Sequence, residues 1–163
     1  MKASTITMIM FILWIAIATV GRLIPHLPNA TPLASLAILS AVILRKHWAV
    51  LLTLTSLCLS DFILGHMTHA ATWGNWTLFT YTGYIALALC VPSQHNLRAV
   101  LPYTLFATFG YWVWTNFGTW LVAGDYPQNW AGLSSCYLAG LPFLRNAVLG
   151  NFVYLFILQQ FPL

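Results

Sequence analysis

The chain has 163 residues, of which 60% are hydrophobic and only 5% are charged. A soluble domain carries roughly 25% charged residues because its surface must face water, so this composition excludes a soluble globular protein. The net charge of +4 comes from six basic residues spread along the chain, which excludes the clustered basic surface of a nucleic-acid-binding protein. We therefore expect an integral membrane protein whose surface faces lipid.

Apolar runs separated by proline, glycine and polar residues divide the chain into six segments. A membrane-spanning helix needs about 20 mostly apolar residues, and with short loops 163 residues can hold about six of them. Pro32 suits a first helical turn, and Gly65 is a stop signal. The expected helices are 5–23, 32–44, 48–64, 76–91, 99–122 and 135–159. We predict an all-α integral membrane protein, a six-transmembrane-helix bundle in which residues 1–163 form one domain.

The basic residues predict the orientation of this bundle, because cytoplasmic loops carry an excess of Lys and Arg. With a cytoplasmic N-terminus, Lys2, Arg45, Lys46 and Arg98 all fall on the inner side, and only Arg22 falls near the outer side. Both termini are thus expected in the cytoplasm, in a multi-pass protein of the cytoplasmic (inner) membrane. The first apolar run could instead be a cleaved signal peptide, but we expect it to be retained as a helix.

The three expected outer segments, 22–31, 65–75 and 123–134, are rich in His, Asn and aromatic residues, whereas the inner loops are short and basic. Such a surface could form the mouth of a ligand site. The alternative is the interfacial belt that Trp and Tyr form in many membrane proteins. The candidate ligand-binding residues on this side are His26, Asn29, His66, Trp76 and Tyr126.

Asp61 and Arg145 are charges expected inside the third and sixth helices, at similar depths. A charge alone in the bilayer costs at least a few kcal/mol, so each needs a partner or a wet cavity. The two residues could form an ion pair that joins these helices, or the polar floor of a ligand cavity, or both. We count both as candidate ligand-binding residues.

Cys58 precedes Asp61 by three residues, so the two share a face of the third helix. A thiolate is a soft metal ligand, whereas most free cysteines are small buried core residues; a disulfide with Cys136 is a further alternative. The histidines allow a separate metal hypothesis, in which His26, His66 and His69 join Asp61. That pattern lacks the spacing of a dedicated Cys/His site.

The fifth helix presents Trp112, Asn116 and Trp120 on one face. An amide within a span points inward toward a partner, so this face could line a cavity for a flat ligand or could simply pack against another helix.

The chain has only two acidic residues and no hydrolase or phosphate-binding motif. The residues therefore give no indication of hydrolase chemistry.

Several segments, in order along nearly the whole chain, resemble the S components of energy-coupling-factor vitamin transporters. They are residues 22–34, residues 59–65, residues 115–120, Tyr126-Pro127 with Gly132-Leu133, and residues 141–150. The resemblance implies a six-helix subunit with a ligand site near the outer face, roofed by the outer loops. It is closest to the solitary cobalamin-binding (BtuM) branch, whose members are similar in small size and carry a cysteine near the outer end of helix 3.

This resemblance implies vitamin uptake, with cobalamin as the bound substrate, no intrinsic cofactor, and the Cys58 thiolate as a ligand of the corrinoid cobalt. Alternatives are another small vitamin or precursor, or an enzyme that removes the upper ligand of a corrinoid through Cys58. S components that dock on a shared coupling subunit carry an Ala-xxx-Ala pattern in helix 1. Helix 1 has Ala16 and Ala18 but no such pair, so an energy-coupling module is not expected to dock in the usual way.

Overall fold

The computed structural model is all-helical and describes residues 3–44, 46–91 and 97–158. Its helices are α1 (Ala3–Leu23), α2 (Leu33–Ile43), α3 (Lys46–Thr68), α4 (Asn75–Leu89), α5 (Leu97–Val122) and α6 (Trp130–Leu158). The prediction of six helices is confirmed. Two predicted ends were wrong: α3 continues past Gly65, and α6 begins five residues before residue 135. Lys2, Arg45, the side chain of Arg98 and residue 159 lie outside the described part.

Helix α2 lies at the centre of the bundle, and nine of its eleven residues are buried. It contacts each of the other five helices, which follow one another around it in the order α1, α3, α4, α5, α6. Small residues let α1 and α6 approach the chain just before α2 closely. A Cβ on Gly21 would lie 2.3 Å from the Pro32 ring, and one on Gly150 would lie 2.8 Å from Ala30 Cα.

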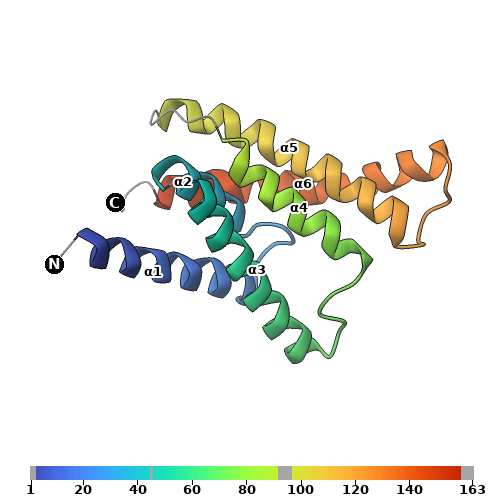
Figure 1. Cartoon of the computed structure of the whole chain (residues 1–163). Coiled ribbons are helices and arrows are strands. Elements are labelled where there is room, and N and C mark those ends of the chain that lie inside the picture. The colour runs from blue at the N-terminus through green and yellow to red at the C-terminus, as the bar shows by residue number, and fades with distance from the viewer. Residues whose placement is uncertain (1–2, 45, 92–96, 159–163) are drawn as a thin grey trace.

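The first described residues of α1 and the last of α6 lie at one end of the bundle, which we call the terminal end (Figure 1). The connections 24–32, 69–74 and 123–129 lie toward the opposite end, the loop end. There α3 diverges from α5 and α6 (Figure 1), and α3 and α6 make no contact in the described residues. At about 1.5 Å per residue, the 11-residue α2 is only about 16 Å long. It therefore fills the terminal half of the bundle and leaves the centre of the loop half open.

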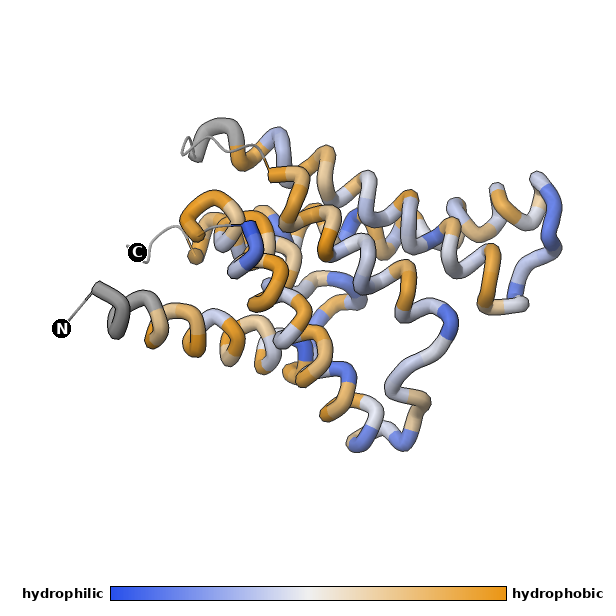
Figure 2. The backbone as a smooth tube through the Cα atoms, viewed as in Figure 1, coloured by the Kyte–Doolittle hydropathy of each residue, from blue (hydrophilic) through white to orange (hydrophobic). Residues whose placement is uncertain are grey.

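Apolar residues predominate in the helices, and hydrophilic residues lie at the connections and also at points within the helices (Figure 2). Two described helices, α3 and α6, are long and apolar enough to cross a membrane. Many large apolar side chains face outward, among them Phe106, Leu138 and Leu78. A soluble monomer rarely exposes such extensive apolar surface, so the chain has the features of a membrane protein.

Candidate functional site: a polar cavity in the loop half

A cavity of about 770 Å³ occupies the loop half of the bundle. Side chains from all six helices and from the three loop-end connections form its wall. Helix α2 contributes only Ala34, from its first turn, because the rest of that helix lies below the cavity. The cavity thus exists because α2 is shorter than the helices that surround it.

An ion pair lies in the cavity wall and joins α1 to α3. Arg22 Nη1 and Asp61 Oδ1 are 2.7 Å apart, and both side chains are largely buried. Arg22 Nη1 also donates to Ser60 Oγ, whose own hydrogen bonds run back to the α3 backbone. These contacts fix the guanidinium beside the carboxylate, so that neither charge is left alone in a partly apolar wall.

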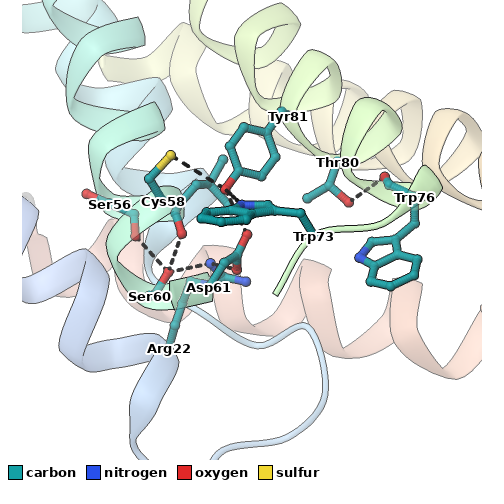
Figure 3. A network of polar contacts seen from close by, with 10 residues as sticks. Arg22, Ser56, Cys58, Ser60, Asp61, Trp73, Trp76, Thr80 and Tyr81 are labelled. Carbon is teal, nitrogen blue, oxygen red and sulfur yellow. Dashed lines mark hydrogen bonds and ion pairs between the residues drawn. The ribbon is translucent and has the colours of Figure 1, made fainter. Parts of the chain in front are cut away.

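Tyr81 connects this ion pair to α4. Its hydroxyl donates to Asp61 Oδ2 at 3.0 Å and accepts a hydrogen bond from Trp73 Nε1 at 3.3 Å. Figure 3 shows the side chains of Arg22, Asp61 and Tyr81 converging from α1, α3 and α4. The carboxylate is therefore hydrogen-bonded from two sides. We call Arg22, Asp61 and Tyr81 the charged floor of the cavity; α1, α3, α4 and the connection 69–74 hold it in place.

Cys58 lies at the edge of this network and is exposed. Its Sγ is 3.7 Å from Tyr81 Oη, but Cys58 is not part of the cavity wall. The hydroxyl of Tyr81 has one proton, and the carboxylate of Asp61 is the stronger acceptor for it. The role of Cys58 as a cobalt ligand stays a prediction, and a thiolate there would have to turn toward the cavity to reach a ligand.

The predicted ion pair between Asp61 and Arg145 is wrong. The carboxylate pairs with Arg22 instead, and Arg145 is exposed on α6. The prediction matched the depths of the two charges but assumed that α3 and α6 are neighbours. In the described residues these helices make no contact, because α4 and α5 lie between them in the order around α2.

The opposite wall is formed by α5 and α6. Trp112 Nε1 donates to the Gly140 carbonyl at 2.9 Å, and Asn116 Nδ2 donates to the Trp112 carbonyl at 2.8 Å. A Cβ on Gly140 would lie 2.3 Å from Asn116 Oδ1, so only glycine permits this approach. Both predicted residues thus line the cavity and also hold the α5–α6 contact, which makes the two alternative interpretations of this face compatible.

Seven of the ten predicted ligand-binding residues belong to the cavity wall. They are His26, Asn29, Asp61, Trp76, Trp112, Asn116 and Tyr126. The three outside it are His66, Trp120 and Arg145. Trp120 has a structural contact of its own, since its Nε1 donates to the Pro127 carbonyl at 2.9 Å and holds the connection 123–129 against α5.

The metal hypothesis for the histidines finds no support, because no three His, Cys, Asp or Glu side chains come together in the described residues. His26 Nδ1 lies 2.6 Å from the Ile24 carbonyl, which fixes the ring locally. The alternative of a Cys58–Cys136 disulfide was also wrong, because both thiols are free, Cys58 being exposed on α3 and Cys136 buried on α6.

Two wall residues of consequence, Arg22 and Tyr81, were not among the predicted site residues. Arg22 was treated only as a marker of orientation, although it was the one basic loop residue on the side that the charge rule disfavours. This unusual position was the signal in the sequence that could have identified Arg22 as a site residue. Tyr81 is one of seven tyrosines, and nothing in its spacing distinguishes it from the others.

A second polar cluster lies at the end of the cavity next to α2, between α2, α5 and α6. Asn151 Nδ2 donates to Thr108 Oγ1 at 2.8 Å, and Ser35 Oγ donates to Asn151 Oδ1 at 3.2 Å. All three side chains are buried. The cavity therefore offers an ion pair, hydroxyls, amides and aromatic faces, which suit binding of a polar organic molecule with a ring system.

Fold and site together define an all-helical protein with a membrane-type surface and a polar cavity among its helices. The chain belongs to the family of unknown function DUF6580, whose model matches residues 2–161. Comparison with curated proteins and with solved structures gave no match.

Proposed function

We propose that the protein is a six-span protein of the cytoplasmic membrane with both termini in the cytoplasm. Three observations support this proposal: charged residues make up 5% of the chain, large apolar side chains face outward, and α1 begins at the end where α6 finishes. Lys46 starts α3 at this terminal end and donates to the Leu89 carbonyl at 2.7 Å. The position of Lys46 at the terminal end agrees with a cytoplasmic location of that end under the charge rule, and the cavity then opens toward the outside.

Within this framework we propose that the protein binds a vitamin at the cavity and serves in its uptake, as S components do. The observation that carries the proposal is the cavity itself. Its volume of about 770 Å³ lies within the range of small-ligand sites, and its wall combines the Arg22–Asp61 ion pair with the aromatic and amide face of α5. The segments that resemble S components include Arg22, Asp61 and Asn116, all of which lie in the wall.

Cobalamin is the first candidate ligand, on the resemblance to the cobalamin-binding branch. The amide arms of a corrinoid would find donors and acceptors among Asn29, Asn116 and Tyr126. A corrinoid is large, so the connections 24–32, 69–74 and 123–129 would have to move apart to admit it. Coordination of its cobalt by Cys58 would also require the thiol to turn inward past Tyr81.

A smaller vitamin or vitamin precursor is the second candidate. Two observations favour it: the cavity has the size of an ordinary small-molecule site, and the Cys58 thiol is not in its wall. Such a ligand would contact the charged floor and Trp112 without a metal–thiolate bond. The two candidates therefore differ in whether Cys58 is needed for binding.

An absorbance titration of the purified protein with cobalamin separates them, because corrinoid spectra report the ligands of the cobalt. The titration compares wild type with Cys58→Ala and with Cys90→Ala, a matched control at the terminal end of α4. A one-to-one spectral shift that only Cys58→Ala abolishes supports cobalamin bound through the thiolate. One-to-one binding with the same spectrum in all three proteins supports cobalamin without that bond.

Absence of cobalamin binding rejects the first candidate. Thermal shift with a panel of smaller vitamins then tests the second, with Asp61→Asn as the variant expected to lose the response. If no vitamin raises the melting temperature of the wild type, the uptake function is rejected. Repeated release of an altered corrinoid would instead identify an enzyme.

A further inference from the structure

Arg145 lies in the middle of α6, the longest helix, at 15 residues from Trp130 and 13 from Leu158. At about 1.5 Å per residue it is roughly 20 Å from either end. The hydrocarbon core of a bilayer is about 30 Å thick, so a central position is about 15 Å from each interface. Long basic side chains reach water only when they lie near helix ends. Arg145 cannot reach it from the centre.

The side chain of Arg145 faces away from the cavity. One face of α6 lines the cavity, and Arg145 belongs to a different face. The residues that line the cavity include Gly140, Leu144, Ala147 and Asn151. The other face carries Leu138, Leu141, Arg145, Leu149 and Val153, all of which are exposed. Arg145 is therefore a single cation in an apolar outward row.

No hydrogen bond or ion pair joins Arg145 to any residue in the described part of the chain. A guanidinium exposed to hydrocarbon costs at least a few kcal/mol, and such residues are found paired or beside water. Arg145 is not in the wall of the described cavity, and its outward neighbours Leu141 and Leu149 are apolar. An anionic partner at the same depth, supplied by another molecule, would remove this cost.

The chain itself cannot supply that partner. It has two acidic residues; Asp61 is bound to Arg22, and Asp125 is exposed in the connection 123–129. A second copy packed against α6 would bring two Arg145 side chains together rather than offer a carboxylate. A lipid phosphate stays at the interface and does not reach the centre of the core.

We propose that the outward face of α6, centred on Arg145, binds a membrane helix of a different protein that carries a carboxylate near the middle of its span. The inference rests on the proposed membrane-spanning arrangement and not on the identity of the vitamin. Helix 1 lacks the Ala-xxx-Ala pattern used for docking by S components, and the outward face of α6 would serve as a docking surface instead. Packing of the partner helix against the apolar row stabilises the complex, and the ion pair makes it specific for a helix with a carboxylate.

The test uses the full-length protein in phosphatidylcholine vesicles with synthetic single-span Leu/Ala helices that carry one central Glu or one central Gln. Energy transfer from a dye on Cys90, in a Cys58→Ala background, to a dye on the peptide reports association. We expect the Glu helix to bind about tenfold more tightly than the Gln helix, from the strength of interhelical polar contacts in membranes. Arg145→Lys should keep this preference and Arg145→Leu should abolish it, while Lys46→Gln should leave it unchanged.

Equal binding of the Glu and Gln helices by the wild type would overturn the proposal. So would a disulfide between two copies of Leu149→Cys in the membrane, because it would identify a second copy as the occupant. Extraction of the protein by alkaline carbonate is measured in parallel. Release into the soluble fraction would reject the membrane-spanning arrangement itself, whereas a retained protein without Glu preference would reject only the docking surface.

Discussion

Arg22 Nη1 lies 2.7 Å from Asp61 Oδ1, and this contact joins the last turn of α1 to α3 at the floor of the cavity. The two residues are 39 positions apart and come from helices that pack directly against each other. The pair places a compensated charge where a bound molecule would lie. It is the relationship on which both the stability of the loop half and ligand binding are expected to depend.

Breaking this pair should destabilise the protein. We expect Asp61→Asn and Arg22→Gln each to lower the free energy of unfolding in detergent by about 1–3 kcal/mol, because each leaves the other charge unpaired in a partly buried wall. The double variant should recover part of the summed loss. Thermal unfolding followed by intrinsic tryptophan fluorescence measures all four proteins.

Arg145→Gln provides the control for this cycle. Since Arg145 makes no contact with Asp61, its effect should add to that of Asp61→Asn within about 0.5 kcal/mol. A coupling between Asp61 and Arg145 larger than that between Asp61 and Arg22 would contradict the arrangement of helices around α2.

Removing the hydroxyl of Tyr81 should weaken the floor without removing its charges. Tyr81→Phe deletes the hydrogen bond to Asp61 Oδ2, and we expect a loss of about 1 kcal/mol in unfolding free energy and weaker binding of any ligand that contacts the carboxylate. Tyr137→Phe is the matched control, because its hydroxyl donates to the Val113 carbonyl outside the cavity wall. If both variants reduce ligand affinity equally, the floor has no special role.

Glycine substitutions on α5 and α6 should have opposite effects. Gly140→Ala places a Cβ 2.3 Å from Asn116 Oδ1 and 2.9 Å from Trp112 Nε1, so we expect displacement of the wall and destabilisation by about 1–3 kcal/mol. Gly110→Ala meets no atom within 4 Å and should stabilise α5 by about 0.5–1 kcal/mol. Melting temperatures measure both, and a stabilising Gly140→Ala would rule out the tight α5–α6 contact.

The buried cluster around Asn151 should be sensitive to a nonpolar substitution. Asn151→Leu removes the side-chain amide that bonds Ser35 and Thr108, although Ser35 Oγ keeps its bond to the residue 151 carbonyl, and should cost about 1–3 kcal/mol. Asn146→Leu, on the same helix but outside the cavity wall, serves as the control and should change stability by less. Hydrogen exchange of α2 would show whether the loss is transmitted to the central helix.

The approximate extents of the helices followed from the sequence, because they depend on local properties. These are the length of each apolar run and the Pro or Gly residues that end it. Trp112 and Asn116 could be assigned to the cavity for a similar reason, since residues four apart on a helix share a face. The partner of Asp61 could not be assigned in this way. The depth estimate pointed to Arg145 and placed Arg22 in an outer segment, and only the packing of α1 against α3 identifies Arg22 as the partner.

The sequence by itself determined that the chain is helical, apolar at its surface and nearly free of acidic residues, because these properties depend on composition and local periodicity. The tertiary structure alone decided where the charges meet. The short α2 packs in the terminal half and leaves a cavity in the loop half, where Arg22, Asp61 and Tyr81 converge from three helices. Which side chains lie together in the cavity depends on contacts between segments that are distant in the sequence. These contacts cannot be deduced from the spacing of residues along one helix.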